Sequence, residues 1–111
     1  MPIKSGMHPK SPGILPAVNQ RKHALFELGQ CVCTPTLLKH FQNNGVDPGH
    51  YLRQHSFGLW GDVPAEDARE NDLSVVNGYR VLSAYSVAGI KFWIITEKDR
   101  SLTTLLTPSE Y

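Results

Sequence analysis

The side chains that could do chemistry are concentrated between Arg53 and Asp62, where an arginine, a histidine, a tryptophan and an aspartate lie close together. His55 has an ordinary pKa near neutral pH and can transfer protons, while an arginine such as Arg100 can stabilise developing negative charge. Metal-free cleavage of RNA needs these groups. The same stretch is also typical of a helix end, with Trp60 in the core and Asp62 as a cap.

Other polar side chains are candidate partners of His55 or candidate binding residues. If the chain is a nuclease, we expect Ser83, Thr103 and Arg100 to share one cleft with His55. If it is a binding protein, the candidate contact residues are Trp60, Asp62, Asn71, Trp93 and Asp99. Several of them also have a structural interpretation, because threonine suits strands, Asn71 or Asp72 can hydrogen-bond a nearby loop, and Glu97–Ser101 can be a solvated turn.

The chain lacks the signature patterns of several common enzyme classes. It contains no G-x-G-x-x-G, G-x-x-x-x-G-K-[ST], H-E-x-x-H or G-x-S-x-G, which argues against dinucleotide enzymes, P-loop NTPases, zincins and α/β-hydrolases. Cys31 and Cys33 are too close in sequence for normal disulfide geometry, so we expect reduced thiols. Because no further ligand pair follows at zinc spacing, we expect neither a metal nor a cofactor.

Proline and glycine punctuation predicts the elements that must position these side chains. Three helices are predicted, each beginning at or just after a proline, over 35–44, from 48 to the glycine at 58, and over 64–76. Alternating apolar residues predict three strands, over 79–87, 90–96 and 102–107, and 28–33 is an edge strand or an extended lead-in. The predicted class is α+β, with three short helices on one face of a three- to four-stranded antiparallel meander.

Both faces of the strand over 90–96 carry large apolar side chains. Phe92 and Ile94 share one face, whereas Trp93 and Ile95 share the other. The helices need only one face of the sheet. The second face is therefore either covered in another way or open to a partner.

The formal net charge of +1 combines two unlike regions. Residues 1–26 contain four basic side chains, no acidic ones and half of the eight prolines, whereas residues 27–111 contain seven basic and ten acidic side chains. We predict a flexible basic arm over 1–26, which could contact nucleic acid, and a single α+β domain over 27–111. Because the chain has neither a long apolar run nor a secretory signal, we expect a cytoplasmic protein without membrane association.

From Leu28 onward the sequence resembles a family of small bacterial proteins carried on plasmids and other mobile elements. The resembling segments are L-G-Q-C-V-C-T-P-T-L-L, R-Q-H-S-F-G-L-W-G-D, E-N-D, R-V-L-S-A-Y and F-W-I-I-T-E-K-D-R-S-L-T-T-L-L-T-P-S-E-Y. Members carry labels such as "plasmid-related protein" or "type I restriction endonuclease subunit M". The resemblance implies a mobile-element accessory protein, associated with restriction–modification, that binds a host or defence-related protein. The chain lacks the N-P-P-[FY] motif of a DNA methyltransferase.

A more distant similarity supports the alternative function. Helices followed by antiparallel strands, with a histidine beside the helices, are similar to the metal-independent ribonucleases of the barnase, EndoU and RelE group. This similarity implies a small ribonuclease or toxin in which His55 is the general acid and base.

Overall fold

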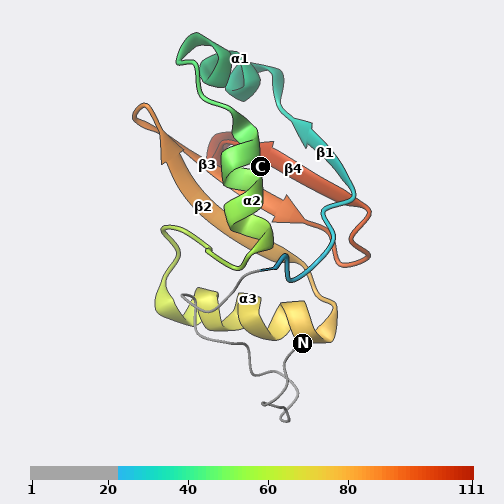
Figure 1. Ribbon diagram of the computed structural model, residues 1–111. Coiled ribbons are helices and arrows are strands. Elements are labelled where there is room, and N and C mark those ends of the chain that lie inside the picture. Colours follow the sequence, from blue (N-terminus) through green and yellow to red (C-terminus); the bar gives the residue numbers. More distant parts are fainter. Residues whose placement is uncertain (1–22) are drawn as a thin grey trace.

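The computed structural model describes residues 23–111, and the predicted arm up to residue 22 lies outside the described residues. One strand is followed by three α-helices and then by three more strands, all joined by short connections (Figure 1). Their order is β1 (Gln30–Cys33), α1 (Pro35–Asn43), α2 (Pro48–Ser56), α3 (Ala65–Asn77), β2 (Val81–Val87), β3 (Ile90–Thr96), β4 (Leu102–Leu106) and the 3₁₀ turn η2 (Pro108–Glu110). No helix in this described part is long and apolar enough to cross a membrane.

The helices begin and end at or close to the positions that the proline, glycine and capping residues predict. Thr34 precedes the proline that starts α1, and Asp47 accepts a hydrogen bond from the Gly49 backbone N–H at 2.8 Å to cap α2. Pro64 occupies the N-cap position of α3, and Gly78 ends that helix in the left-handed conformation at φ 78°. These local signals act within one helical turn, which is why they could be recognised without tertiary information.

The four strands form one mixed sheet in the order β1-β4-β3-β2. The last three strands form the expected antiparallel meander, with Trp93 of β3 opposite Ala84 of β2 and Leu106 of β4. The α+β class is thus confirmed. The first strand differs from the antiparallel expectation, because β1 pairs with β4 in parallel. All three helices separate these two strands in sequence, and parallel neighbours need such a long connection.

Helices α1 and α2 cover one face of the sheet, which we call the inner face (Figure 1). Its core consists of apolar side chains from α1 and from the three meander strands, namely Leu37, Phe41, Tyr85, Val87, Phe92, Ile94 and Leu105. Tyr51 and Leu52 of α2 pack against this core. The opposite, outer face carries Trp93 and Ile95. Helix α3 lies beside β2, where it flanks the sheet.

The segment before β1 packs against the folded body. The Leu25 backbone N–H donates to the Ser56 carbonyl at 2.7 Å, and the Phe26 ring packs against His55 and Trp60. The predicted arm extended to residue 26, but Leu25 is hydrogen-bonded to the end of α2 and Phe26 packs on two buried rings.

Candidate functional site

His55 lies in the last turn of α2 and is completely buried against the inner face. It follows Tyr51 by four residues, so both side chains project from the same side of the helix. Its Nδ1 lies 2.5 Å from the Ser83 hydroxyl, and its Nε2 lies 2.9 Å from the Thr96 hydroxyl. Strand register places these hydroxyls together, because Thr96 and Ser83 both point toward the helices.

The hydrogen bonds around His55 have one consistent direction. Thr103 must donate to the Leu28 carbonyl at 2.7 Å, because a carbonyl only accepts. Thr96 therefore donates to Thr103 across their 2.7 Å contact, and Thr96 Oγ1 accepts from His55 Nε2. The other ring nitrogen, Nδ1, accepts from Ser83. His55 is thus a neutral ring protonated at Nε2, with both nitrogens in use.

Aromatic rings close the space around this histidine. Phe26 meets the His55 ring edge-on at a centroid distance of 5.2 Å, and Trp60 does so at 5.9 Å. Burial, together with the positive charge of Arg100, lowers the pKa of His55 to about 3. The ring therefore stays neutral at physiological pH.

Arg100 uses its guanidinium to hold the chain together. Nη1 donates to the Tyr79 carbonyl at 2.7 Å and to the Glu97 carbonyl at 3.2 Å, and Nη2 donates to the Ser74 carbonyl at 3.0 Å. The guanidinium carbon also lies 5.2 Å from the centre of the Phe26 ring. Arg100 thereby ties the last turn of α3 to the β3–β4 turn and holds Phe26 over His55.

The four residues predicted for a nuclease are thus close together, but they do not line an open cleft. Ser83 and Thr103 are as completely buried as His55. Sequence reasoning missed Thr96 as a partner of His55, although its even spacing from Phe92 and Ile94 placed it on the inner face. It also missed Phe26, for which the sequence contains no recognisable signal.

Three of the predicted binding residues have clear structural partners. Trp60 is buried, and its indole N–H donates to Asp72 Oδ1 at 3.0 Å. Asn71 is also buried, and its amide pairs with both backbone groups of Leu82, accepting from N–H at 3.2 Å and donating to C=O at 2.8 Å. Asp99 is exposed and accepts from the Ser101 N–H and hydroxyl, which lower the pKa of its carboxyl.

The remaining two, Asp62 and Trp93, lie in different places. The Asp62 side chain is exposed, while its backbone N–H donates to the Ala84 carbonyl at 2.7 Å. Trp93 is half-buried on the outer face, where Tyr111 packs on it edge-on at 5.6 Å. The Tyr111 hydroxyl accepts from Arg80 at 2.8 Å, and the guanidinium carbon lies 5.7 Å from the tyrosine ring centre. We call Arg80, Trp93 and Tyr111 the outer-face cluster.

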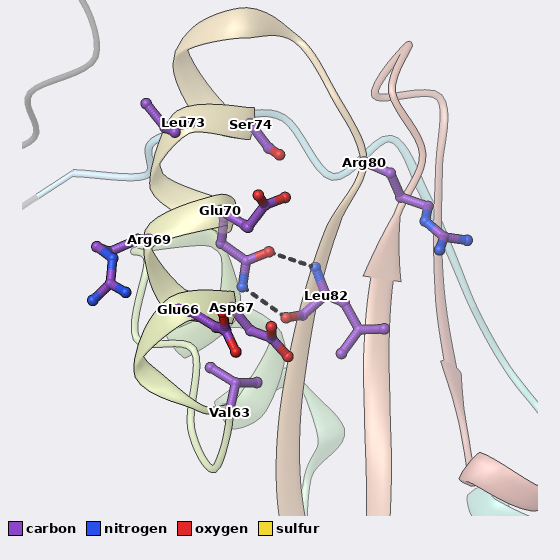
Figure 2. Close-up of a pocket in the computed structure, with 10 residues that line it drawn as sticks. Val63, Glu66, Asp67, Arg69, Glu70, Leu73, Ser74, Arg80 and Leu82 are labelled. Carbon is purple, nitrogen blue, oxygen red and sulfur yellow. Dashed lines mark hydrogen bonds between the residues drawn. The ribbon is translucent and has the colours of Figure 1, made fainter.

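A groove of about 590 Å³ runs between α3 and β2 (Figure 2). Its charged lining residues are three acids, Glu66, Asp67 and Glu70, and two bases, Arg69 and Arg80. Asn71 and Leu82 also line the groove, and the Asn71 amide pairs with the backbone N–H and C=O of Leu82. His55 does not line this groove.

Cys31 and Cys33 are free thiols. Burial, with the negative charge of Glu110 as a second cause, raises the pKa of Cys33 to about 11, and burial also raises the pKa of Cys31. Both are therefore protonated at neutral pH. Among residues 23–111, no three histidine, cysteine, aspartate or glutamate side chains gather where they could hold a metal ion.

Comparison with known proteins finds no family model that matches the chain, and no curated protein or solved structure matches it either.

Proposed function

We propose that this chain binds a protein partner through the outer face of its sheet, as an accessory protein of a mobile element acting on a host or defence-related protein. The observation that carries the proposal is the outer-face cluster. Neither α1 nor α2 covers this face, and Trp93 and Tyr111 present aromatic surface there beside Arg80. Tryptophan, tyrosine and arginine are the residue types that dominate the binding energy of protein interfaces.

The outer-face cluster is held in position before any partner arrives. Arg80 fixes the Tyr111 ring by a hydrogen bond and a cation–π contact, and the ring in turn packs on Trp93. Trp93 is on a central strand that is paired on both sides. Less conformational freedom is therefore lost on binding than if these large side chains were mobile.

The state of His55 supports binding rather than RNA cleavage. A general acid or base must come within hydrogen-bond distance of a reacting group. Both nitrogens of His55 already have hydroxyl partners, and the ring is shielded from solvent. Its low pKa also leaves no proton to donate from an imidazolium near neutral pH.

The proposal is tested by capturing partners from bacterial lysates and repeating the binding with each purified candidate. Trp93→Ala should lose the interaction. The matched control Leu38→Ala removes an apolar side chain of α1 that is 38% exposed on the other side of the sheet, and it should bind normally. Equal binding by wild type, Trp93→Ala and Tyr111→Ala would overturn the proposal.

One observation favours the ribonuclease alternative, namely that Ser83, Thr103 and Arg100 lie near His55, although they share no open cleft with it. The direct test incubates purified protein with single-stranded RNA. We expect the RNA to stay intact. Cleavage by wild type that disappears in a folded His55→Gln variant would establish the alternative instead.

A further inference from the structure

The two edges of the sheet differ in how their backbone groups are satisfied. Along the edge of β2 that faces away from β3, the Asn71 amide pairs with the backbone N–H and C=O of Leu82. On the same edge, the Ala84 N–H donates to the Trp60 carbonyl at 3.0 Å. The Ala84 carbonyl accepts from the Asp62 N–H, and the neighbouring Gly61 forms an isolated β-bridge with Ala84. The Tyr51 hydroxyl donates at 3.3 Å to the carbonyl of Ser86, the next residue whose backbone groups point away from β3. These contacts pair the N–H and C=O groups of Leu82 and Ala84 and the carbonyl of Ser86, so most of the β2 edge is closed.

The opposite edge is formed by β1, the last strand on its side of the sheet in the described part of the chain (Figure 1). The N–H groups of Gln30 and Thr34 donate to β4 or to the residue before it, each at 3.0 Å. Because alternate residues of a strand direct their backbone groups to the same side, those of Cys31 and Cys33 point away from the sheet. The β1 edge therefore presents two N–H and two C=O groups.

Strand β1 has none of the residues by which proteins block an exposed edge. Its sequence, Gln-Cys-Val-Cys, contains no charge and no proline. Val32 adds an apolar side chain that is 38% exposed. Lysine, proline or a covering segment is the usual protection against pairing with another strand, and the strand itself supplies neither of the first two.

We propose that β1 pairs antiparallel with β1 of a second copy of this chain, giving a symmetric dimer with a continuous eight-stranded sheet. A second copy fits because residues 23–111 of each chain leave the β1 edge open and close most of the β2 edge. Pairing two open edges about a two-fold axis uses both of them, and the closed β2 edges stop further growth. The inference goes beyond the proposed function, which needs no dimer.

The strand sequence suits a two-fold axis that passes through Val32. In that register Val32 lies opposite Val32 of the second copy, which matches two apolar side chains on the outer face. Cys31 then lies opposite Cys33 of the second copy, and each such pair exchanges two backbone hydrogen bonds. The outer faces of the two sheets become continuous, with an outer-face cluster on each side of the axis.

The mass of the full chain in solution, measured by analytical ultracentrifugation over a range of concentrations, tests the dimer. Cys31→Pro removes an N–H that points outward and leaves the ladder to β4 intact. We expect a concentration-dependent dimer for wild type and self-association weakened about 100-fold or more in Cys31→Pro, because the new ladder loses its hydrogen bonds. The matched control Cys31→Thr keeps the N–H and should dimerise like wild type.

Amide exchange locates the interface and keeps the test decisive. In wild type, exchange of the Cys31 and Cys33 amides should slow as the protein concentration rises. If Cys31→Pro fails to fold, Val32→Lys replaces it, because that side-chain change spares the ladder but places like charges opposite each other. A wild-type chain that stays monomeric at about 0.5 mM, where even weak edge pairing would populate dimer, would overturn the proposal.

Two further results would also overturn it. One is a dimer that persists in folded Cys31→Pro. The other is slow exchange of these amides at every concentration, which would mean that the edge is covered by the chain's own residues. Loss of the dimer with normal partner binding would leave the proposed function standing, since Trp93 is not part of β1.

Discussion

The two faces of the sheet have opposite characters although the same strands form both. On the inner face, α1, α2 and the segment before β1 enclose Phe92 and a chain of hydroxyls around His55. On the outer face, Trp93 is half-buried, and the Tyr111 ring packs on it edge-on. Adjacent residues of β3 therefore have different surroundings: Phe92 is enclosed in the core, and Trp93 keeps part of its ring exposed.

This contrast shows how burial decides the role of a polar group. His55 has the residue type and the neighbours for acid–base chemistry, but enclosure turns the group into a hydrogen-bonded part of the core. The outer-face cluster has no reactive group of comparable kind, yet it is accessible. Accessibility, rather than chemical type, is the reason why we propose the outer face and not His55 as the binding surface.

Substitution of adjacent residues on β3 should give the largest difference between the faces. Phe92 is completely buried, so Phe92→Ala should lower the free energy of unfolding by about 4 kcal/mol through lost burial and the cavity left behind. Denaturant unfolding measures this change. A loss below about 1 kcal/mol would show that the inner face is not a tightly packed core.

The buried histidine should make stability depend on pH. The pKa of His55 is about 3 in the folded chain and about 6.5 when unfolded, so the unfolded state binds more protons between these values. This contribution is complete above pH 6.5 and is lost as pH falls, at about 1.4 kcal/mol per unit or nearly 3 kcal/mol by pH 4.5. His55→Gln should lack this dependence, and parallel slopes for the two proteins would contradict a buried neutral ring.

Removal of the Asn71 side chain should open the closed edge of β2. Asn71→Ala leaves the N–H and C=O of Leu82 without their partner, which should cost about 2 kcal/mol in unfolding experiments. The variant should also aggregate faster, because a second edge is exposed. Asp62→Ala, at an exposed side chain of the same region, is the control and should change stability by no more than about 0.5 kcal/mol.

The smallest effect on stability is expected on the outer face. Trp93→Ala should cost about 1 kcal/mol, because the ring is only half-buried and leaves no enclosed cavity. Trp93→Ala should therefore change the thermal unfolding temperature only slightly and lose most of the partner binding. A destabilisation as large as that of Phe92→Ala would remove the distinction between the two faces.

Much of the local structure could be predicted because its signals lie close together in the sequence. Proline and capping residues defined the starts of the helices, and the period-two pattern identified the meander and the two faces of β3. The hydrogen bonds that Asp99 accepts from Ser101 also follow from their spacing of two residues. The parallel pairing of β1 with β4 had no such signal, because it joins segments separated by three helices.

The sequence alone determined the α+β class, the segments that become helices and strands, and the residue types available for chemistry. Only the tertiary structure decided which of them are accessible. Phe26, Arg100 and the inner face enclose His55. On the outer face, Tyr111 packs on Trp93 and accepts a hydrogen bond from Arg80. The physical reason is that burial and hydrogen-bond saturation depend on residues far apart in sequence, which local patterns do not encode.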